Sequence, residues 1–258
     1  MEINELSFSY DKQTDSIKNV TCTVAEGAIT TIIGPNGSGK STLLGLMSRN
    51  YAPRHGQIML DGKALSSYKP KELAKKLAVV HQHNEAPADM TVEKLVGFGR
   101  LPHKGMFRQD SGDGEEAVEW ALASTNLIGK RQLRIDRLSG GERQRVWIAM
   151  ALAQKTPILF LDEPTTYLDI YYQFEILELV KKLNAELGLT IVMVLHDINQ
   201  AIRYSDNLIV MKKGEVLIMG EPETVVTPAV MKTVYGVDVK ISRDEDSGLY
   251  MLPLGIHA

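Results

Sequence analysis

The residues from Gly34 to Thr42, Gly-Pro-Asn-Gly-Ser-Gly-Lys-Ser-Thr, have the types and the spacing of a loop that binds phosphate groups. The glycines let the backbone turn tightly enough for successive N–H groups to face phosphate oxygens. The Lys40 ammonium is expected to reach the β- and γ-phosphates of a nucleotide, and the Ser41 hydroxyl to ligate Mg²⁺. The residues expected to contact the nucleotide here are Gly34, Asn36, Gly37, Ser38, Gly39, Lys40, Ser41 and Thr42.

The flanks of this loop favour the same function. Ile29–Ile33, which precedes it, is an apolar run typical of a β-strand, and Leu43–Met47, which follows it, is typical of a helix. A helix that begins at such a loop adds the positive end of its dipole to the phosphate site. A chance match to this motif in a chain of average glycine content has odds on the order of one in a hundred.

A second set of candidate residues follows another strand. The apolar run Ile158–Leu161 predicts a buried strand that ends in Asp162 and Glu163. Buried parallel strands bring their carboxyl ends to one edge of a sheet, so these carboxylates are expected beside the phosphate loop. Asp162 would hold Mg²⁺ together with Ser41. Glu163 would accept a proton from an attacking water molecule.

A third motif, Leu138–Gln144, opens a predicted helix that runs to about Gln154. Its serine, its paired glycines and the helix N-terminus predict a second anion-binding nest. The residues expected to form this nest are Ser139, Gly140, Gly141 and Glu142. One chain that offers two γ-phosphate sites needs an explanation, and the simplest is that the nest covers a nucleotide bound on another subunit.

Together these motifs resemble the nucleotide-binding subunit of an ATP-binding cassette (ABC) transporter over essentially the whole chain. Leu138–Glu142 is similar to the family's Leu-Ser-Gly-Gly-Gln signature, with Glu142 in place of the glutamine. The resemblance assigns further roles in chain order: Tyr10 stacks on adenine, Gln82 ligates the metal and assists catalysis, Asp169 forms the D-loop with Leu168, and His196 contacts the γ-phosphate.

The resemblance implies a fold: an α/β P-loop NTPase core with an inserted helical lobe and an N-terminal antiparallel β region. The expected parts of this single ABC ATPase domain are a core at 1–84 and 157–234, a helical lobe at 85–156, and a C-terminal β-hairpin extension at 235–258. Within the lobe, Gly97–Gly114 is rich in glycine, proline and basic residues, which predicts an exposed surface.

The resemblance also implies partners. Two copies would form a homodimer that binds ATP and Mg²⁺ at two composite sites, with Lys40, Gln82, Glu163 and His196 in catalysis. The segment around Glu85–Gly114 would receive a helix from one of two transmembrane permease subunits, which an extracytoplasmic solute-binding protein supplies with cargo. Three segments are similar to importers of iron–siderophore complexes, with haem and cobalamin importers as close relatives: Gly99–His103, Pro164–Ile170 and Tyr235–Asp238.

Composition limits the other possibilities. The 258 residues carry a net charge of −3, so no basic excess favours nucleic-acid binding. The single cysteine, Cys22, lies in an alternating run and is expected to be an inert strand residue. The N-terminus lacks the pattern of a signal peptide, and no apolar run approaches the roughly 18 residues that span a bilayer. We therefore expect a peripheral protein held at the cytoplasmic face of the membrane by the permease.

Three alternatives stay open at this point. An ABC exporter subunit would share the same motifs. A soluble ABC ATPase of DNA repair or translation usually carries two cassettes or a long coiled-coil insertion, and this chain has neither. A phosphate-loop kinase would have no use for the nest at Ser139–Glu142.

Overall fold

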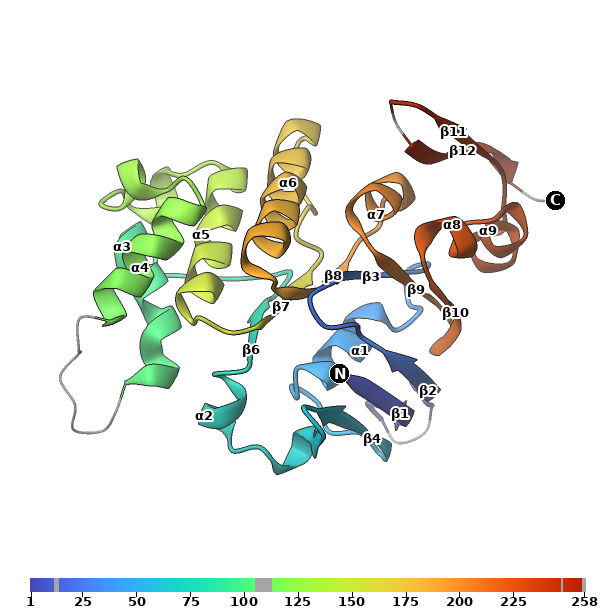
Figure 1. The fold of residues 1–258 in the computed structure, drawn as a ribbon, viewed down its shortest axis with the longest axis horizontal. Coiled ribbons are helices and arrows are strands. Elements are labelled where there is room, and N and C mark those ends of the chain that lie inside the picture. Colours follow the sequence, from blue (N-terminus) through green and yellow to red (C-terminus); the bar gives the residue numbers. More distant parts are fainter. Residues whose placement is uncertain (12–13, 105–112, 247, 257–258) are drawn as a thin grey trace. The chain divides into compact units, whose positions relative to one another are not determined.

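The computed structural model describes residues 1–11, 14–104, 113–246 and 248–256. The chain forms two compact units. The first unit combines Met1–Ser67 with Thr190–Ala258, and the second comprises Tyr68–Leu189. Figure 1 labels the elements of both units along the chain.

The first unit is mostly β-structure with short helices. Its strands are β1 (Glu2–Phe8), β2 (Ile17–Thr23), β3 (Ile29–Ile33), β4 (His55–Leu60), β5 (Lys63–Ala64), β8 (Thr190–Val194), β9 (Asn207–Lys212), β10 (Glu215–Gly220), β11 (Val237–Asp244) and β12 (Gly248–Ile256). Its helices are α1 (Lys40–Met47), α7 (Ile198–Tyr204), α8 (Pro222–Val225), α9 (Pro228–Tyr235) and the 3-10 turn η1 (Leu65–Ser67).

Strand β3 lies between β8 and β9 and is parallel to both. All five of its residues are buried, which explains why its sequence is continuously apolar or β-branched instead of alternating. Strand β9 turns into β10 through Lys213 and Gly214, both at positive φ, as a two-residue hairpin requires. The strand predicted at Ile29–Ile33 is therefore confirmed.

The N-terminal strands form a separate antiparallel sheet in the order β2-β1-β4-β5. Alternating apolar residues of β1 and β2 bury one face, with Ile3, Leu6 and Ile17 fully enclosed. The N-terminal antiparallel region expected from the sequence is present. Cys22 is buried in β2, in agreement with an inert strand residue.

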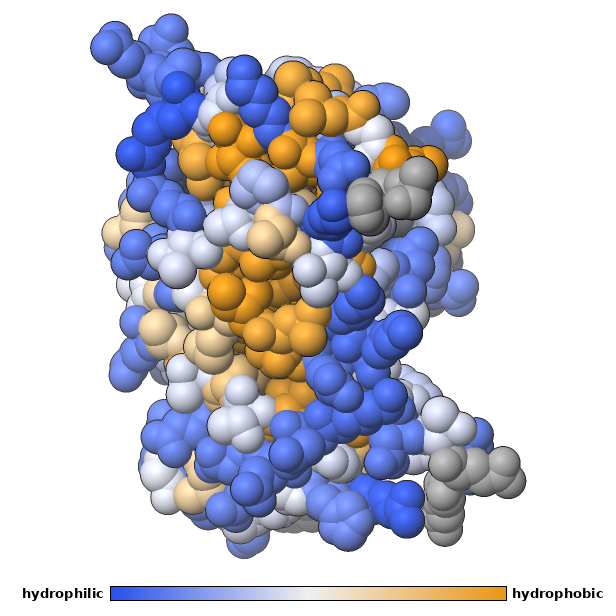
Figure 2. Space-filling model, turned by 90° about the vertical axis from the view of Figure 1, so that its right-hand side faces the viewer, coloured by the Kyte–Doolittle hydropathy of each residue, from blue (hydrophilic) through white to orange (hydrophobic). Residues whose placement is uncertain are grey.

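Strands β11 and β12 pair as an antiparallel hairpin at the end of the chain. The Asn199 side chain of α7 bonds to both backbone groups of Met251, since its Nδ2 donates to the carbonyl (3.1 Å) and its Oδ1 accepts from the N–H (2.8 Å). Residues 247, 257 and 258 of the hairpin extension expected at 235–258 lie outside the described residues. Figure 2 shows apolar side chains gathered on the side that carries β10 and this hairpin. Leu217 of β10 and Leu254 of β12 are both exposed.

The second unit is mostly helical. Its elements are α2 (Pro70–Leu73), β6 (Leu77–Val80), α3 (Val92–Gly97), the 3-10 helix η2 (Phe98–His103), α4 (Asp113–Ser124), the 3-10 turns η3 (Ile128–Lys130) and η4 (Ile135–Arg137), α5 (Gly140–Ala153), β7 (Ile158–Asp162) and α6 (Ile170–Leu187). Helix α5 is central, because α3, α4 and α6 all pack against it (Figure 1). Strands β6 and β7 are parallel, with Val80 opposite Leu161. Within the described residues, no helix combines the length and apolar character that crossing a membrane requires.

One expectation about the lobe is wrong in part. The Gly97–Gly114 segment was expected to be exposed, but it begins with η2, whose Gly99 and Arg100 are buried. The Arg100 Nη1 atom donates to the Ala153 carbonyl at 2.8 Å, which satisfies the otherwise open end of α5. Composition does not reveal this contact because the partner lies more than 50 residues away. Residues 105–112 of the segment lie outside the described residues.

Gly99 provides a sharp test of this packing. A Cβ atom on Gly99 would collide with the Met150 carbonyl oxygen, which belongs to the backbone and cannot move aside. We expect Gly99→Ala to lower the free energy of unfolding by at least about 2 kcal/mol in urea titrations. Gly97→Ala is the matched control, since a Cβ there meets nothing within 4 Å. Equal stability of the two variants would contradict the close approach of η2 to α5.

Candidate functional site

The phosphate loop joins the end of β3 to the start of α1 and needs its glycines for two different reasons. Gly34, Gly37 and Gly39 all have positive φ, at 154°, 75° and 102°. A Cβ on Gly34 would also collide with the Met211 carbonyl oxygen. Gly39 is the N-cap of α1, so the loop ends where the helix exposes its first N–H groups. The loop predicted from the sequence therefore has the backbone of an anion-binding nest.

Lys40 lies at the centre of this loop. Its side chain is buried, and its Nζ atom donates to the Gly34 carbonyl at 2.9 Å and to the Pro35 carbonyl at 3.3 Å. These carbonyls hold the ammonium over the loop. A phosphate oxygen would replace them with a stronger, charge-assisted acceptor.

Tyr10 lies beside the phosphate loop, where the sequence did not place it. Its hydroxyl is 3.0 Å from the Thr42 Oγ1 atom, and 58% of the residue is exposed. Its ring makes edge-to-face contacts with Phe8 and Tyr51, with centroids 4.9 and 5.4 Å away. The sequence analysis missed Phe8 and Tyr51. The cluster leaves a fixed, exposed aromatic ring next to the loop, which suits stacking on a nucleobase.

His196 follows β8 and is exposed. The register of β3 and β8 determines where His196 lies relative to the phosphate loop, since Ile32 of β3 is opposite Val194 of β8. Two residues further along each strand come Gly34 and His196, which therefore leave the sheet at the same edge. The next residue, Asp197, caps α7 by accepting from the Gln200 N–H at 2.9 Å, so the turn that carries His196 is fixed.

Glu163 and Gln82 come together in the second unit. Gln82 follows β6, Glu163 follows β7, and the Gln82 Nε2 atom donates to the Glu163 Oε2 atom at 2.5 Å. The same oxygen accepts from the Thr166 hydroxyl at 3.0 Å, a partner that the sequence analysis missed. Glu163 also has a φ of 51°, a strained conformation that costs of order 1 kcal/mol and is typical of functional positions. Asp162 is the last residue of β7, directly before it.

The signature motif forms the N-terminus of α5. Ser139 is the N-cap, and it exchanges hydrogen bonds with Glu142: the Ser139 N–H donates to Oε2 at 2.8 Å, and the Glu142 N–H donates to Oγ at 3.3 Å. Lys130 also pairs with the Glu142 carboxylate, and this bond is the main cause that lowers the pKa of Glu142. The Glu142 carboxylate thus stabilises the backbone conformation of the nest. The N–H groups of Gly140 and Gly141 have no acceptor inside the helix.

The start of α6 packs directly on this nest. A Cβ on Gly141 would lie 2.6 Å from the Tyr172 ring, and one on Gly140 would lie 3.3 Å from the Leu168 side chain. Asp169 is the N-cap of α6, although its side chain makes no capping bond. The glycines of the signature motif therefore also let α5 and α6 approach closely, a role that spacing alone did not reveal.

The candidate residues thus fall into two groups. The first unit carries the phosphate loop, Tyr10 and His196. The second unit carries Gln82, Asp162, Glu163, Asp169 and the signature nest. Each group is assembled from several elements of its own unit.

The state of Cys22 yields a simple chemical prediction. Burial raises the pKa of its thiol to about 11 and shields it from solvent. We expect the native protein at pH 8 to react with a thiol reagent such as DTNB at least roughly 100-fold more slowly than the urea-unfolded chain. Fast reaction of one thiol in the native protein would contradict the packing of β2.

Comparison with known proteins adds independent observations. A family profile described as ABC transporter matches residues 17–166. The petrobactin import ATP-binding protein FpuC of Bacillus anthracis is 44% identical over 97% of this chain and 92% of its own length. The ferric enterobactin transport ATP-binding protein FepC of Escherichia coli strain K12 is 43% identical, over 97% and 93%. A metal-chelate type ABC transporter, solved in an inward-facing conformation, superposes with a TM-score of 0.85 at 25% identity, over 98% of this chain and 96% of the other.

Proposed function

This chain belongs to the ABC transporter family, and we propose that it is the ATP-hydrolysing subunit of a bacterial importer for iron–siderophore complexes or related metal chelates. The chain has the ABC ATPase fold, binds ATP and is an ATPase. One observation supports the substrate class most: relatives that align over nearly their whole length are named for petrobactin import and ferric enterobactin transport.

We propose that the nucleotide lies on the phosphate loop, with its base on Tyr10 and its phosphates on the N–H groups of Gly34 and of Asn36 to Thr42. Mg²⁺ is proposed to be held by the Ser41 hydroxyl, the Asp162 carboxylate and the Gln82 amide oxygen. These are the hard oxygen ligands that Mg²⁺ prefers. The Gln82 Nε2 atom donates to Glu163, so its Oε1 atom is the one suited to ligate a cation. When bound, the metal would neutralise charge on the β- and γ-phosphates.

The proposed chemistry is in-line attack of water on the γ-phosphate. Glu163 orients the water and accepts its proton, and the bonds from Gln82 and Thr166 hold the carboxylate in place. Lys40 donates to the phosphate oxygens on which charge accumulates. His196 contacts the γ-phosphate from the sheet edge that carries the loop.

We propose that two copies pair head to tail, so that ATP on the loop of one copy is covered by the signature nest of the other. The open N–H groups of Gly140 and Gly141, at the start of a 14-residue helix, suit an anion. Ser139 adds its hydroxyl, and Glu142 contributes by fixing the cap. Asp169 is proposed to lie beside the same nucleotide.

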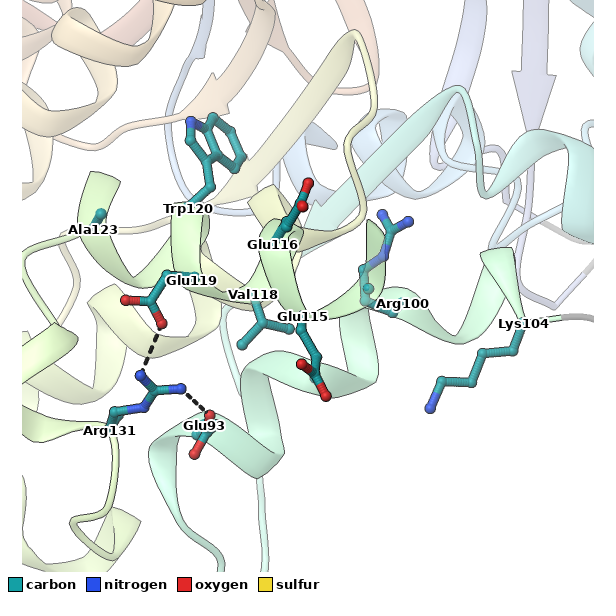
Figure 3. A pocket seen from close by; sticks show the side chains of 12 residues that line it. Glu93, Arg100, Lys104, Glu115, Glu116, Val118, Glu119, Trp120, Ala123 and Arg131 are labelled. Carbon is teal, nitrogen blue, oxygen red and sulfur yellow. Dashed lines mark hydrogen bonds and ion pairs between the residues drawn. The ribbon is translucent and has the colours of Figure 1, made fainter. Parts of the chain in front are cut away.

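A pocket in the second unit suits the proposed permease contact. It has a volume of about 790 Å³ and lies within and beside the Glu85–Gly114 segment. Figure 3 shows charged side chains of both signs around it, with Arg131 bonded to Glu93 and to Glu119. We propose that a cytoplasmic helix from one of two permease subunits docks here in each copy, which would hold the protein at the cytoplasmic face of the membrane. The solute-binding protein would act only through the permease.

We propose that different segments of the chain have different roles. Segments 1–84 and 157–234 form the nucleotide-binding core, 85–156 forms the helical lobe that meets the permease, and 235–258 is a hairpin extension. An exporter subunit or a soluble ABC ATPase would use the same core. The protein or complex that binds this chain therefore distinguishes these functions from import.

The test is to purify the tagged chain from membranes of its own cells and to reconstitute the complex in liposomes. We expect a polytopic permease to co-purify, and ATP turnover to rise at least about fivefold with a ferric siderophore on its binding protein. Ferric catecholates, ferric hydroxamates, haem and cobalamin would be compared. Co-purification with ribosomes or DNA, or stimulation by none of these chelates, would contradict the proposal.

A further inference from the structure

The last helix and the terminal hairpin have no role in the proposed reaction, yet they contact two elements that carry site residues. Residues 228–246 and 248–256 contain α9, β11 and β12. We call them the C-terminal arm. Helix α9 packs on β11, where Val234 and Val239 are buried and Lys232 pairs with Asp238 at 3.7 Å. The arm is therefore one packed piece.

The hairpin end of the arm is bonded to the first turn of α7. The Asn199 side chain donates to the Met251 carbonyl at 3.1 Å and accepts from the Met251 N–H at 2.8 Å. These two bonds repeat the exchange that a neighbouring strand would make with the edge of β12. His196 lies only three residues before Asn199, and Asp197 between them caps α7. The arm therefore holds the turn that carries His196.

The helix end of the arm is bonded to the phosphate loop. A hydrogen bond joins the hydroxyl of Tyr235, the last residue of α9, to the backbone of Gly34. The Lys212 Nζ atom donates to the Thr233 carbonyl, also in α9. Lys212 follows Met211, whose carbonyl oxygen lies against Gly34. Two contacts thus hold α9 beside the first residue of the loop.

The ladder between β3 and β8 does not by itself fix the distance between these two site elements. It ends at Ile32 and Val194, so Gly34 and His196 both lie beyond its last pair. A group that meets the γ-phosphate in the transition state needs accurate placement, because misplacement by about 1 Å can cost about 100-fold in rate. A second connection between the loop and α7 would supply this accuracy.

We propose that Asn199 and Tyr235 are positioning residues, which use the C-terminal arm to set the separation between His196 and the phosphate loop. This inference rests on the proposed function, in which the loop holds the nucleotide and His196 contacts the γ-phosphate. The arm touches neither the nucleotide nor the metal in this account. It acts only through the two elements that it joins.

The test measures kcat and KM for ATP in the full chain and in Asn199→Ala and Tyr235→Phe, each of which removes one end of the connection. Since the γ-phosphate contact of His196 matters most in the transition state, we expect kcat to fall about 3- to 10-fold in each variant, with KM within about twofold. Lys240→Ala, which changes an exposed side chain of β11, is the control and should keep the parental kcat.

Two further variants separate positioning from folding stability. Both single changes loosen the same arm, so the double variant Asn199→Ala/Tyr235→Phe should lose little more than the worse single variant, whereas independent effects would multiply. In Asn199→Asp the carboxylate can still accept from the Met251 N–H and suits the start of a helix, but it cannot donate to the Met251 carbonyl. An intermediate kcat is expected.

Amide exchange followed by NMR reports on the connection itself. The Met251 N–H points from β12 to the Asn199 Oδ1 atom, so it should exchange at least about tenfold faster in Asn199→Ala than in the parent. An unchanged exchange rate would mean that the bond does not hold the arm on α7, which contradicts the inference.

The kinetic outcomes distinguish a failure of the inference from a failure of the proposed function. His196→Ala should lower kcat at least about tenfold. If it does, while folded Asn199→Ala and Tyr235→Phe keep the parental kcat or lose activity in multiplying steps, the arm has no positioning role and the proposed function stands. A parental kcat in His196→Ala would remove the γ-phosphate contact, and the inference with it.

Discussion

Replacing Glu163 with glutamine is expected to lower kcat for ATP at least about 100-fold while ATP affinity stays within about threefold, because a positioned base contributes that much to proton transfer. Glutamine keeps the size of the side chain and can still meet Thr166, so the loop after β7 should hold its shape. Its amide cannot accept the proton of the attacking water. Steady-state phosphate release and equilibrium nucleotide binding are the measurements.

The matched control is Glu186→Gln, the same change at an exposed position of α6 that pairs only loosely with Lys182 at 3.9 Å. It should turn over ATP at the wild-type rate. Wild-type turnover in Glu163→Gln would contradict the proposed role of Glu163 and would mean that another group accepts the proton.

The second large effect is expected from Lys40→Ala. This change removes the ammonium that the phosphate loop encloses, which donates to the Gly34 and Pro35 carbonyls. Since hydrogen bonds from an ammonium to phosphate are charge-assisted, we expect ATP affinity to fall about 10- to 100-fold and turnover to become undetectable. Isothermal titration gives the affinity.

Lys182→Ala, an exposed lysine on α6, is the control and should bind ATP normally. A thermal melt of both variants separates lost binding from lost folding. Normal ATP affinity in folded Lys40→Ala protein would mean that the nucleotide does not lie on this loop.

The elements that position the chemistry were predictable because local composition determines them. Strand β3 is buried on both faces and is therefore built entirely from isoleucine and β-branched threonine, and the loop after it needs glycine at three positions of positive φ. The same reasoning predicts β7 and the two carboxylates at its carboxyl end. The start of α5 is predictable from Ser139 and Glu142, which form the reciprocal cap that their spacing suggests.

The contacts that sequence reasoning missed are long-range. Tyr51 reaches Tyr10, Lys130 reaches Glu142, and Gly99 lies against the backbone of α5, yet no local pattern links the partners in any of these pairs. Glycine at position 141 was interpreted only as part of a nest, whereas it also accommodates the Tyr172 ring. Side chains that depend on packing between elements become visible only once the fold is known.

The most direct test of the whole account mixes two inactive proteins. Lys40→Ala lacks a working phosphate loop, and Ser139→Phe lacks a working nest, so each should be inactive alone. In a mixed pair, the intact loop of one subunit faces the intact nest of the other. With equal amounts and random pairing, half the pairs are mixed and each has one complete site, so about a quarter of wild-type turnover should return. A mixture as inactive as its components would contradict a reaction centre shared between two copies.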